Sequence, residues 1–241
     1  MDYQLHNVGD QGLLIEFEPE ISIGISQKVW ALKYALEKQR LRGVRELVPA
    51  YRSLLIHYDM LTSDLDQILS AVDYCVRTLD LSQLPNATVT EIPVLYEGEY
   101  ALDIEEIARM ENKTVEEIIR IHSQSDYYIF MLCFSPGHPS TARFENPFSF
   151  KRRSSPRVRI AAGSIVVQLG LSDIIPFEQP CGWNIIGSTP ISICDYRKSN
   201  PFLLQAGQWI RHVPVDKYEF LEIKRQVELG CYQCKTYERG K

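Results

Sequence analysis

Glycine, proline and serine interrupt the chain every few residues between positions 133 and 214. The segments between them are short and apolar, as in Ile165-Val166-Val167, Ile174-Ile175 and Ile191-Ser192-Ile193. Short β-rich runs between Gly and Pro are typical of sandwiches and barrels, and a long helix does not tolerate such spacing. This region therefore predicts a compact all-β unit, either a sandwich or a barrel.

The first 94 residues have a different pattern. Strand-like alternation at 13–17 is followed by helical spacing of apolar residues at 25–36. Two strand patterns follow at 44–48 and 53–58, then a helix at 65–79 that opens at the capping-box sequence Ser63-Asp64-Leu65-Asp66, and a last strand at 88–94. The order β-α-β-β-α-β is that of a ferredoxin-like split βαβ unit. We therefore expect an α+β protein whose N-terminal ferredoxin-like domain covers residues 1–90.

The second domain is expected over residues 91–220, followed by a charged C-terminal tail over 221–241. Asp103 and Thr114 each precede an acidic residue at helical spacing and predict two short helices. A strand at 127–132 leads into Phe134-Ser135-Pro136-Gly137-His138-Pro139, which has the composition of a rigid exposed loop. A surface helix is expected over 216–228.

Several motifs in the second half occur in a fixed order. They are Cys133 to Pro139, Arg152 to Arg157, Ala162-Gly163-Ser164, Pro180 to Trp183, Ile186 to Pro190, and Leu203 to Val215. In this order they resemble the family called allophanate hydrolase subunit 1, or the carboxyltransferase domain C-D family. Its members include the B-type subunit of bacterial ATP-dependent 5-oxoprolinase and the histidine-kinase inhibitor KipI. The resemblance implies that the second domain is a cyclophilin-like β-barrel.

The resemblance also implies a function. The first expectation is one component of a heteromeric ATP-dependent amide hydrolase similar to 5-oxoprolinase, which opens 5-oxo-L-proline to L-glutamate; this chain would be its B-type subunit. The implied partners are a C-type subunit (the carboxyltransferase-like protein called allophanate hydrolase subunit 2) and an amidase-like A-type subunit. ATP would be used together with a partner, because this chain has no recognisable nucleotide loop. The alternatives are a non-catalytic KipI-like inhibitor of a sensor histidine kinase and a component of allophanate or urea metabolism.

Two histidines are the catalytic candidates. His122 ends a predicted helix, where it could complement the helix dipole or serve as an acid or base. The resemblance places a histidine there as well. His138 stands where the family pattern has phenylalanine, so either the pocket wall has changed its chemistry or the pocket no longer serves the ancestral substrate.

The binding candidates lie in the motif-rich region. Arginine forks suit phosphate and carboxylate, although a solvated basic turn would have the same sequence. A Gly-Ser pair allows close approach of a ligand to the backbone, and an aromatic ring can form a pocket wall. The candidates for substrate or phosphate binding are Arg152, Arg153, Arg157, Gly163, Ser164, Ser172 and Trp183. Departures from the family pattern fall mainly in loops, as at Ser172 and Asp173, which suggests a retained fold with an altered site.

Composition excludes several other classes. A net charge of −5 argues against a general nucleic-acid binder. No apolar run approaches the roughly 20 residues that span a bilayer, and no signal peptide is evident, so the cytoplasm is the expected location. The six cysteines are expected to be free thiols, and the pair Cys231 and Cys234 is interpreted as incidental and not as half of a redox or zinc site. No metal site is expected.

Overall fold

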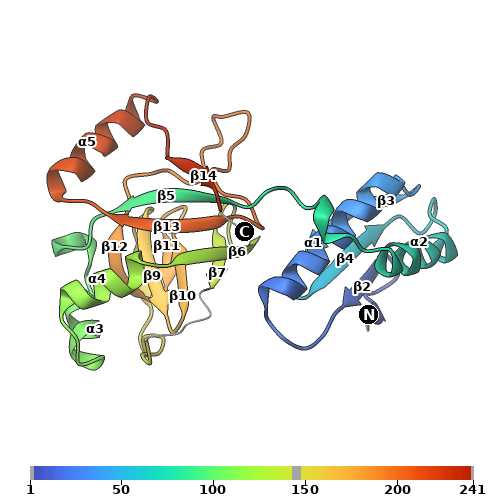
Figure 1. Cartoon of the computed structure of the whole chain (residues 1–241), viewed down its shortest axis with the longest axis horizontal. Helices are drawn as coiled ribbons and strands as arrows, with labels where there is room; N and C mark the ends of the chain where they lie inside the picture. The colour runs from blue at the N-terminus through green and yellow to red at the C-terminus, as the bar shows by residue number, and fades with distance from the viewer. Residues whose placement is uncertain (1–2, 143–147, 240–241) are drawn as a thin grey trace. The chain divides into compact units, whose positions relative to one another are not determined.

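The computed structural model describes residues 3–142 and 148–239 and has a mixed α+β architecture (Figure 1). Its contacts divide the chain into two compact units, Met1–Asn86 and Ala87–Lys241. The division falls a few residues before the expected boundary at residue 90, which would cut through a strand. Each unit has its own apolar core.

The N-terminal unit is a four-stranded antiparallel sheet with the strand order β1-β2-β4-β3. The strands are β1 (Gln4–Asn7), β2 (Gly12–Glu16), β3 (Val44–Pro49) and β4 (Ser53–Tyr58). The core is shared by one face of the sheet and by the helices α1 (Ile23–Gln39) and α2 (Leu65–Arg77). Strict alternation of buried and half-buried residues in β4 creates that apolar face.

Side chains fix where both helices begin. The Ser22 hydroxyl accepts a hydrogen bond from the Ile25 amide at 3.3 Å. The Asp64 carboxylate accepts bonds from the amides of Asp66 and Gln67. These bonds satisfy amides that have no partner inside the helix. The predicted capping box with Ser63 as its first residue does not form, because Asp64 caps the helix and the Ser63 hydroxyl has no hydrogen-bond partner among the described residues.

The last strand of the predicted β-α-β-β-α-β order forms, but in the other unit. After the short 3-10 turn η1 (Leu81–Gln83), β5 (Thr88–Val94) pairs in parallel with β13 (Trp209–Pro214). In the N-terminal sheet the edge beside β2 is occupied by β1, which the sequence pattern did not reveal. The reason is burial: β5 has buried residues on both faces, as a central strand does, whereas β1 is exposed along its length and suits an edge.

In the C-terminal unit the largest sheet has the order β14-β5-β13-β6-β7. Its remaining strands are β6 (Asp126–Leu132), β7 (Pro139–Ala142) and β14 (Thr236–Glu238). A second sheet has the order β10-β9-β12, and a third pairs β11 with β8. These strands are β8 (Arg157–Ile160), β9 (Ser164–Gln168), β10 (Leu171–Ile174), β11 (Gln179–Cys181) and β12 (Asn184–Ser188).

One core joins the two larger sheets. Ile92 of β5, Ile129 of β6 and Ile210 of β13 pack with Ile165 of β9 and Ile186 of β12. Over the described residues of the C-terminal unit, hydrogen bonds join the strands into three sheets and not into one closed barrel. An isolated bridge between Leu95 and Ser188 links the two larger sheets at one point.

The two predicted short helices are present as α3 (Ile104–Met110) and α4 (Val115–Ser123), after a 3-10 turn η2 (Gly98–Tyr100). Thr114 and Glu117 form a complete capping box at α4. Asp103, by contrast, makes no capping bond to α3. Its carboxylate has other partners, which are described below.

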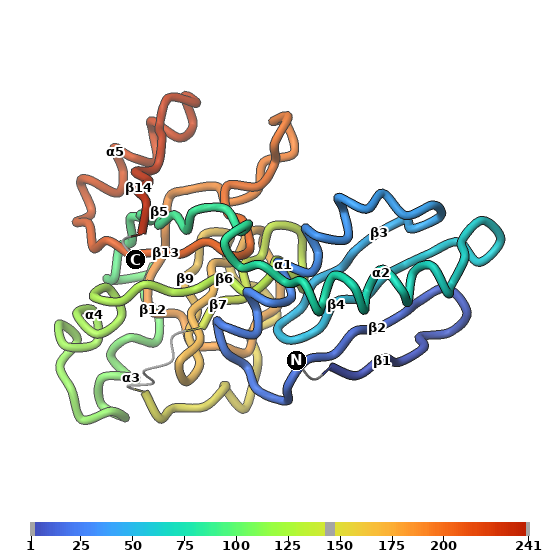
Figure 2. The backbone as a smooth tube through the Cα atoms, turned by 45° about the vertical axis from the view of Figure 1, so that its right-hand side comes forward, coloured from blue at the N-terminus to red at the C-terminus, as the bar shows by residue number. Residues whose placement is uncertain are grey.

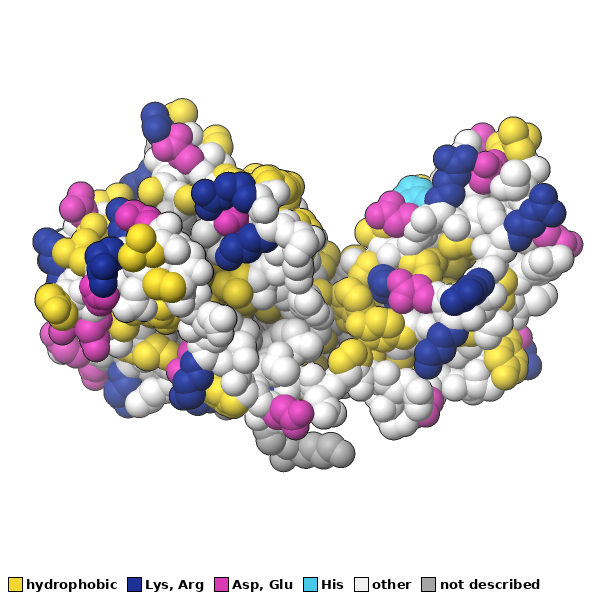
Figure 3. Space-filling model, turned by 90° about the horizontal axis from the view of Figure 1, so that it is seen from above, with side chains coloured by type: hydrophobic (Ala, Val, Ile, Leu, Met, Phe, Trp, Pro, Cys, Tyr) yellow, Lys and Arg dark blue, Asp and Glu magenta, His cyan; other side chains and the backbone are white. Residues whose placement is uncertain are grey.

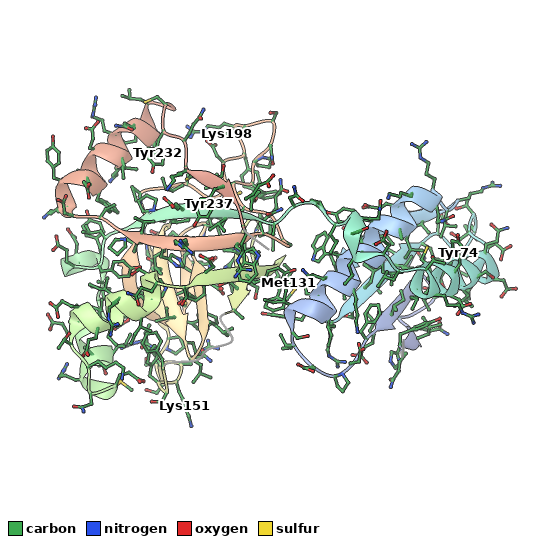
Figure 4. The ribbon with its side chains drawn as sticks, in the orientation of Figure 1. Tyr74, Met131, Lys151, Lys198, Tyr232 and Tyr237 are labelled. Carbon is green, nitrogen blue, oxygen red and sulfur yellow. The ribbon has the colours of Figure 1, made fainter. Side chains whose placement is uncertain are left out.

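The C-terminal residues are more ordered than the predicted tail. The helix α5 (Lys217–Glu228) is capped by Asp216 and Glu219, and β14 then returns to pair with β5 (Figures 1 and 2). Tyr237 of β14, labelled in Figure 4, lies 5.9 Å from the Arg211 guanidinium of β13. Residues 221–239 are therefore part of the unit, because β5 offers an unpaired edge with which β14 pairs.

No helix in the described ranges is both long and apolar enough to cross a membrane. Acidic and basic side chains are interspersed on the face of the molecule shown in Figure 3.

Candidate functional site

The Asp103 carboxylate binds two of the three arginines that the sequence predicted as a ligand site, Arg153 and Arg157. The Asp103 side chain is 3% exposed and accepts two bonds from Arg157, at 2.9 and 2.7 Å, and one from Arg153 at 2.9 Å. The Ile185 amide of β12 donates a fourth bond at 2.7 Å. This carboxylate therefore ties the basic segment to β12, which explains why it does not cap α3.

Arg152 lies apart from this cluster. It is exposed, and its guanidinium covers the backbone of Gly182, where an added Cβ would lie 2.3 Å from Nε. The Arg153 amide bonds the Gly182 carbonyl at 2.9 Å. Lys151, at the start of the basic segment, is exposed and projects outward (Figure 4). The three predicted arginines thus do not converge on one point.

Gly163 and Ser164 hold a tight chain crossing. Gly163 has φ of +82°, and an added Cβ would meet the Thr189 carbonyl oxygen at 2.4 Å. The Gly163 amide donates to the Ile175 carbonyl, and the Thr189 amide donates to the Gly163 carbonyl. The Ser164 hydroxyl donates to the Ala161 carbonyl at 2.8 Å. The absence of a side chain at Gly163 is therefore needed for the close approach of the protein's own backbone at Thr189.

A cavity of about 500 Å³ opens beside this crossing. Its size is within the range of small-molecule sites. Three predicted residues, Arg157, Gly163 and Ser164, line it. The other lining residues that matter below come from η2, β8 and the following turn, the end of β12 and the segment after it, and α5: Glu99, Tyr100, Arg159, Ala161, Ala162, Ser188, Thr189, Ser192, Phe220 and Lys224.

His122 lies in the core and not in this cavity. It is 0% exposed; its Nδ1 is 2.7 Å from the Tyr96 hydroxyl, and its Nε2 is 2.7 Å from the Ser172 hydroxyl. Burial raises the pKa of Tyr96 well above its usual value, so its hydroxyl stays protonated. The arrangement fixes the orientation of the imidazole ring between two hydroxyl groups.

A second buried histidine lies against the first. The ring of His212, from β13, is 4.3 Å from the ring of His122, and the residue is 1% exposed. Neither of its ring nitrogens has a hydrogen-bond partner among the described residues. Burial lowers the pKa of His212 to about 3, so the ring is neutral at physiological pH.

His138 forms a separate polar pair. Its Nε2 lies 3.2 Å from Asp173 Oδ2, and the other Asp173 oxygen accepts the Thr141 amide at 3.1 Å. Both members of the pair are buried, and burial raises the pKa of Asp173. The expectation of an exposed loop at 134–139 is wrong for its second half, because Gly137, His138 and Pro139 are buried while Phe134 is 82% exposed.

Trp183 packs beside a small apolar cluster that includes Ile160 and Val166, and it does not line the cavity. The sequence-predicted residues therefore occupy six places: the cavity, the Asp103 cluster, the core around His122 and Ser172, the His138–Asp173 pair, the surface over Gly182 where Arg152 lies, and the small apolar cluster beside Trp183. Sequence reasoning missed Asp103, His212, Glu99 and Lys224. For Asp103 the signal was present but was interpreted only as a helix start.

Within the described residues, no three His, Cys, Asp or Glu side chains are grouped in a way that could hold a metal ion. The cysteines are free, and burial raises the pKa of Cys133 and Cys181, and that of Cys234 to about 11. These three thiols therefore stay protonated and are poor nucleophiles.

Comparison with known proteins gives one family. The model described as "Carboxyltransferase domain, subdomain C and D" matches residues 3–204. The B-type subunit of 5-oxoprolinase from Bacillus subtilis is 30% identical over 234 residues, which are 93% of this chain and 98% of that protein. The corresponding protein of Haemophilus influenzae is 28% identical over 86% of this chain and 95% of that protein.

Solved structures show the same fold. The crystal structure of TTHA0988 has a TM-score of 0.74 and 29% identity, with 86% of this chain matched to 40% of that chain. The Kluyveromyces lactis urea carboxylase has a TM-score of 0.77 at 17% identity, and the match covers 98% of this chain and 24% of that one. At that identity the second likeness concerns the fold alone.

Proposed function

This chain belongs to the carboxyltransferase domain family of subdomains C and D, and from that membership we propose that it is the B-type subunit of an ATP-dependent 5-oxoprolinase. The observation that carries the proposal is the match to a curated B-type subunit of 5-oxoprolinase over 98% of that protein's length. Such a match leaves no large part of the relative without a counterpart in this chain.

The reaction would open the lactam of 5-oxo-L-proline to L-glutamate at the expense of ATP. An amide carbonyl is unreactive, so it must first be activated by phosphorylation, and positive groups then stabilise the developing charge. The cavity at Gly163 and Ser164 is our proposed substrate- or phosphate-binding region. Arg157 lines it, but with Nη1 and Nη2 both donating to Asp103 it contributes mainly by fixing the cavity wall.

The histidines are proposed in different roles. His122 is held between two hydroxyl groups in the core, which supports a positioning role. His138 lies beneath the exposed ring of Phe134, 5.7 Å away, and so is nearer the surface. We propose His138, paired with Asp173, as the acid or base to be tested first.

The partner proteins belong to the proposal as well. The chain has no phosphate-binding loop motif, so ATP would bind at a site completed by a C-type subunit, with an amidase-like A-type subunit in the same cytoplasmic assembly. The fold of this chain is a minor part of two longer chains, TTHA0988 and urea carboxylase, which supports a need for further domains. We also propose that the N-terminal unit is a ferredoxin-like domain and the C-terminal unit a cyclophilin-like β-barrel domain.

The test is reconstitution. The chain is co-expressed with candidate C-type and A-type proteins, purified through a tag on this chain, and assayed for 5-oxoproline-dependent ATP hydrolysis and glutamate release. The expected result is turnover by the complex and none by the chain alone. A complex that forms but does not turn over 5-oxoproline contradicts the proposal. Inhibition of the autophosphorylation of a sensor kinase by the chain would favour the regulatory alternative.

A further inference from the structure

The cavity wall formed by α5 orients a lysine toward the cavity. Phe220 is 3% exposed, and its ring lies 4.9 Å from that of Tyr100 in η2. Lys224 follows four residues later, so it shares the helix face of Phe220. Both side chains line the cavity, and the aromatic contact holds α5 and η2 together at its edge.

Two of the charged groups at the cavity have no counter-charge. Arg157 is engaged with Asp103, and Arg159 lies 2.5 Å from Glu178. Lys224 of α5 and Glu99 of η2 form no ion pair with any residue in the described part of the chain. The cavity thus offers one available cation and one available anion, from elements that lie against each other.

The serine and threonine hydroxyls around the cavity already form hydrogen bonds within the protein. Ser164 and Ser188 donate to the carbonyls of Ala161 and Gly163. Ser192 donates to the Cys194 carbonyl, and the Thr189 hydroxyl accepts the Ile191 amide. Charge recognition therefore falls to Lys224 and Glu99.

We propose that Glu99 and Lys224 are the specificity-determining residues of this cavity and that they select a small carboxylic acid carrying an N–H donor. Lys224 binds the carboxylate, and Glu99 accepts a hydrogen bond from the N–H group. A ligand without the carboxylate leaves Lys224 without a partner, and a ligand without the N–H group leaves Glu99 without one. Either loss weakens binding, and this difference produces selectivity.

The inference deepens the proposed function, since it names the residues that would recognise the lactam acid. The family model matches residues 3–204, and Lys224 lies after the end of that match. Selectivity would thus depend on a part of the chain that the family model does not include.

Three probes separate the two recognition groups. 5-Oxo-L-proline has both the carboxylate and the lactam N–H. The lactone 5-oxotetrahydrofuran-2-carboxylate keeps the carboxylate and lacks the N–H, and 2-pyrrolidinone keeps the N–H and lacks the carboxylate. Binding to the full chain is followed through the backbone amide NMR signals of Ala161, Ala162 and Gly163, which lie at the cavity.

We expect 5-oxo-L-proline to bind about fivefold more tightly than either analogue, since Glu99 and Lys224 are exposed and a charge-assisted contact at an exposed side chain is worth up to about that factor. Lys224→Ala should bring its affinity down to that of 2-pyrrolidinone, and Glu99→Gln should bring it close to that of the lactone. The matched controls are Lys217→Ala, on the same helix, and Glu97→Gln, beside η2; neither residue lines the cavity, and both variants should bind as the parent chain does.

The inference is overturned if 5-oxo-L-proline leaves these amide signals unchanged, or if Lys224→Ala and Glu99→Gln both bind within twofold of the parent chain. The two proposals can fail separately. Selective binding by the chain without turnover in the reconstituted complex rejects the 5-oxoprolinase function and keeps the site. Turnover by the complex with an unchanged KM in both variants rejects the site and keeps the function.

Discussion

The basic groups of the C-terminal unit serve two different purposes. Arg153 and Arg157 donate to a buried carboxylate, Asp103, and hold the segment before β8 against β12. Lys224 lies at the cavity with no ion-pair partner in the described ranges. The motif that stands out in the sequence thus stabilises the fold, while the available cation comes from a helix without any motif. A basic motif predicts an anion, but the anion can belong to the protein itself.

The sharpest test of this comparison is Arg157→Ala. It removes two hydrogen bonds from Asp103, whose side chain is 3% exposed, and leaves a buried charge poorly compensated. We expect a loss of about 3 kcal/mol in the free energy of unfolding, measured by urea denaturation. Arg157→Lys keeps the charge but cannot form the paired hydrogen bonds, so its free energy of unfolding should fall between those of the parent chain and Arg157→Ala. Parent-like stability combined with weakened ligand binding would show that Arg157 is a ligand residue.

The buried residue His212 can be tested through the pH dependence of the free energy of unfolding. Its pKa of about 3 in the folded chain lies below the ordinary value of 6.5, so the unfolded chain takes up a proton that the folded chain does not. Stability should therefore fall as pH decreases below about 6.5, with this residue contributing about 1.4 kcal/mol per pH unit. In His212→Leu that contribution should vanish between pH 6 and pH 4.5. Urea denaturation curves with the same pH dependence in both chains would contradict this expectation.

Ser172→Ala tests the hydrogen-bond partner of His122. The substitution leaves one ring nitrogen of His122 without its bond to the Ser172 hydroxyl in a fully buried place. The expected cost is about 1–3 kcal/mol in the free energy of unfolding. Ser164→Ala is a useful comparison, because its hydroxyl donates to a carbonyl in a turn beside the cavity. An equal or larger loss of stability in Ser164→Ala would mean that the buried bond between Ser172 and His122 stabilises the chain no more than the turn bond of Ser164.

The smallest effect is expected on the exposed side. Arg159 and Glu178 form an ion pair with side chains 75% and 49% exposed, where water and salt screen the attraction. Arg159→Ala should change the free energy of unfolding by less than about 1 kcal/mol. A loss as large as that of Arg157→Ala would end the distinction between the two groups of basic residues.

Local patterns predicted most of the regular elements. Periodicity located α1, α2 and the strands β2 to β6, and the cap sequences located the starts of α2 and α4. These features depend on neighbours within about four residues, which the sequence displays directly. The pattern missed β1 and β14, since both are too short and too exposed to give a strand pattern.

The candidate site could be predicted only in part. The order of the motifs indicated the family and brought Arg157, Gly163 and Ser164 to attention, and all three line the cavity. The sequence could not show that Asp103, some 50 residues before the arginines, accepts their hydrogen bonds. It also could not place Glu99 and Lys224 at the same cavity.

The sequence by itself determined the two-part organisation of helices and strands, the apolar faces and the family, because each depends on local spacing or on ordered motifs. Tertiary structure alone decided which sheet receives β5, which charges are neutralised and which remain available to a ligand. Those outcomes depend on strand pairing and burial between residues far apart in the chain. An arginine has the same letter whether its partner is a buried aspartate or a substrate, and only the fold distinguishes the two.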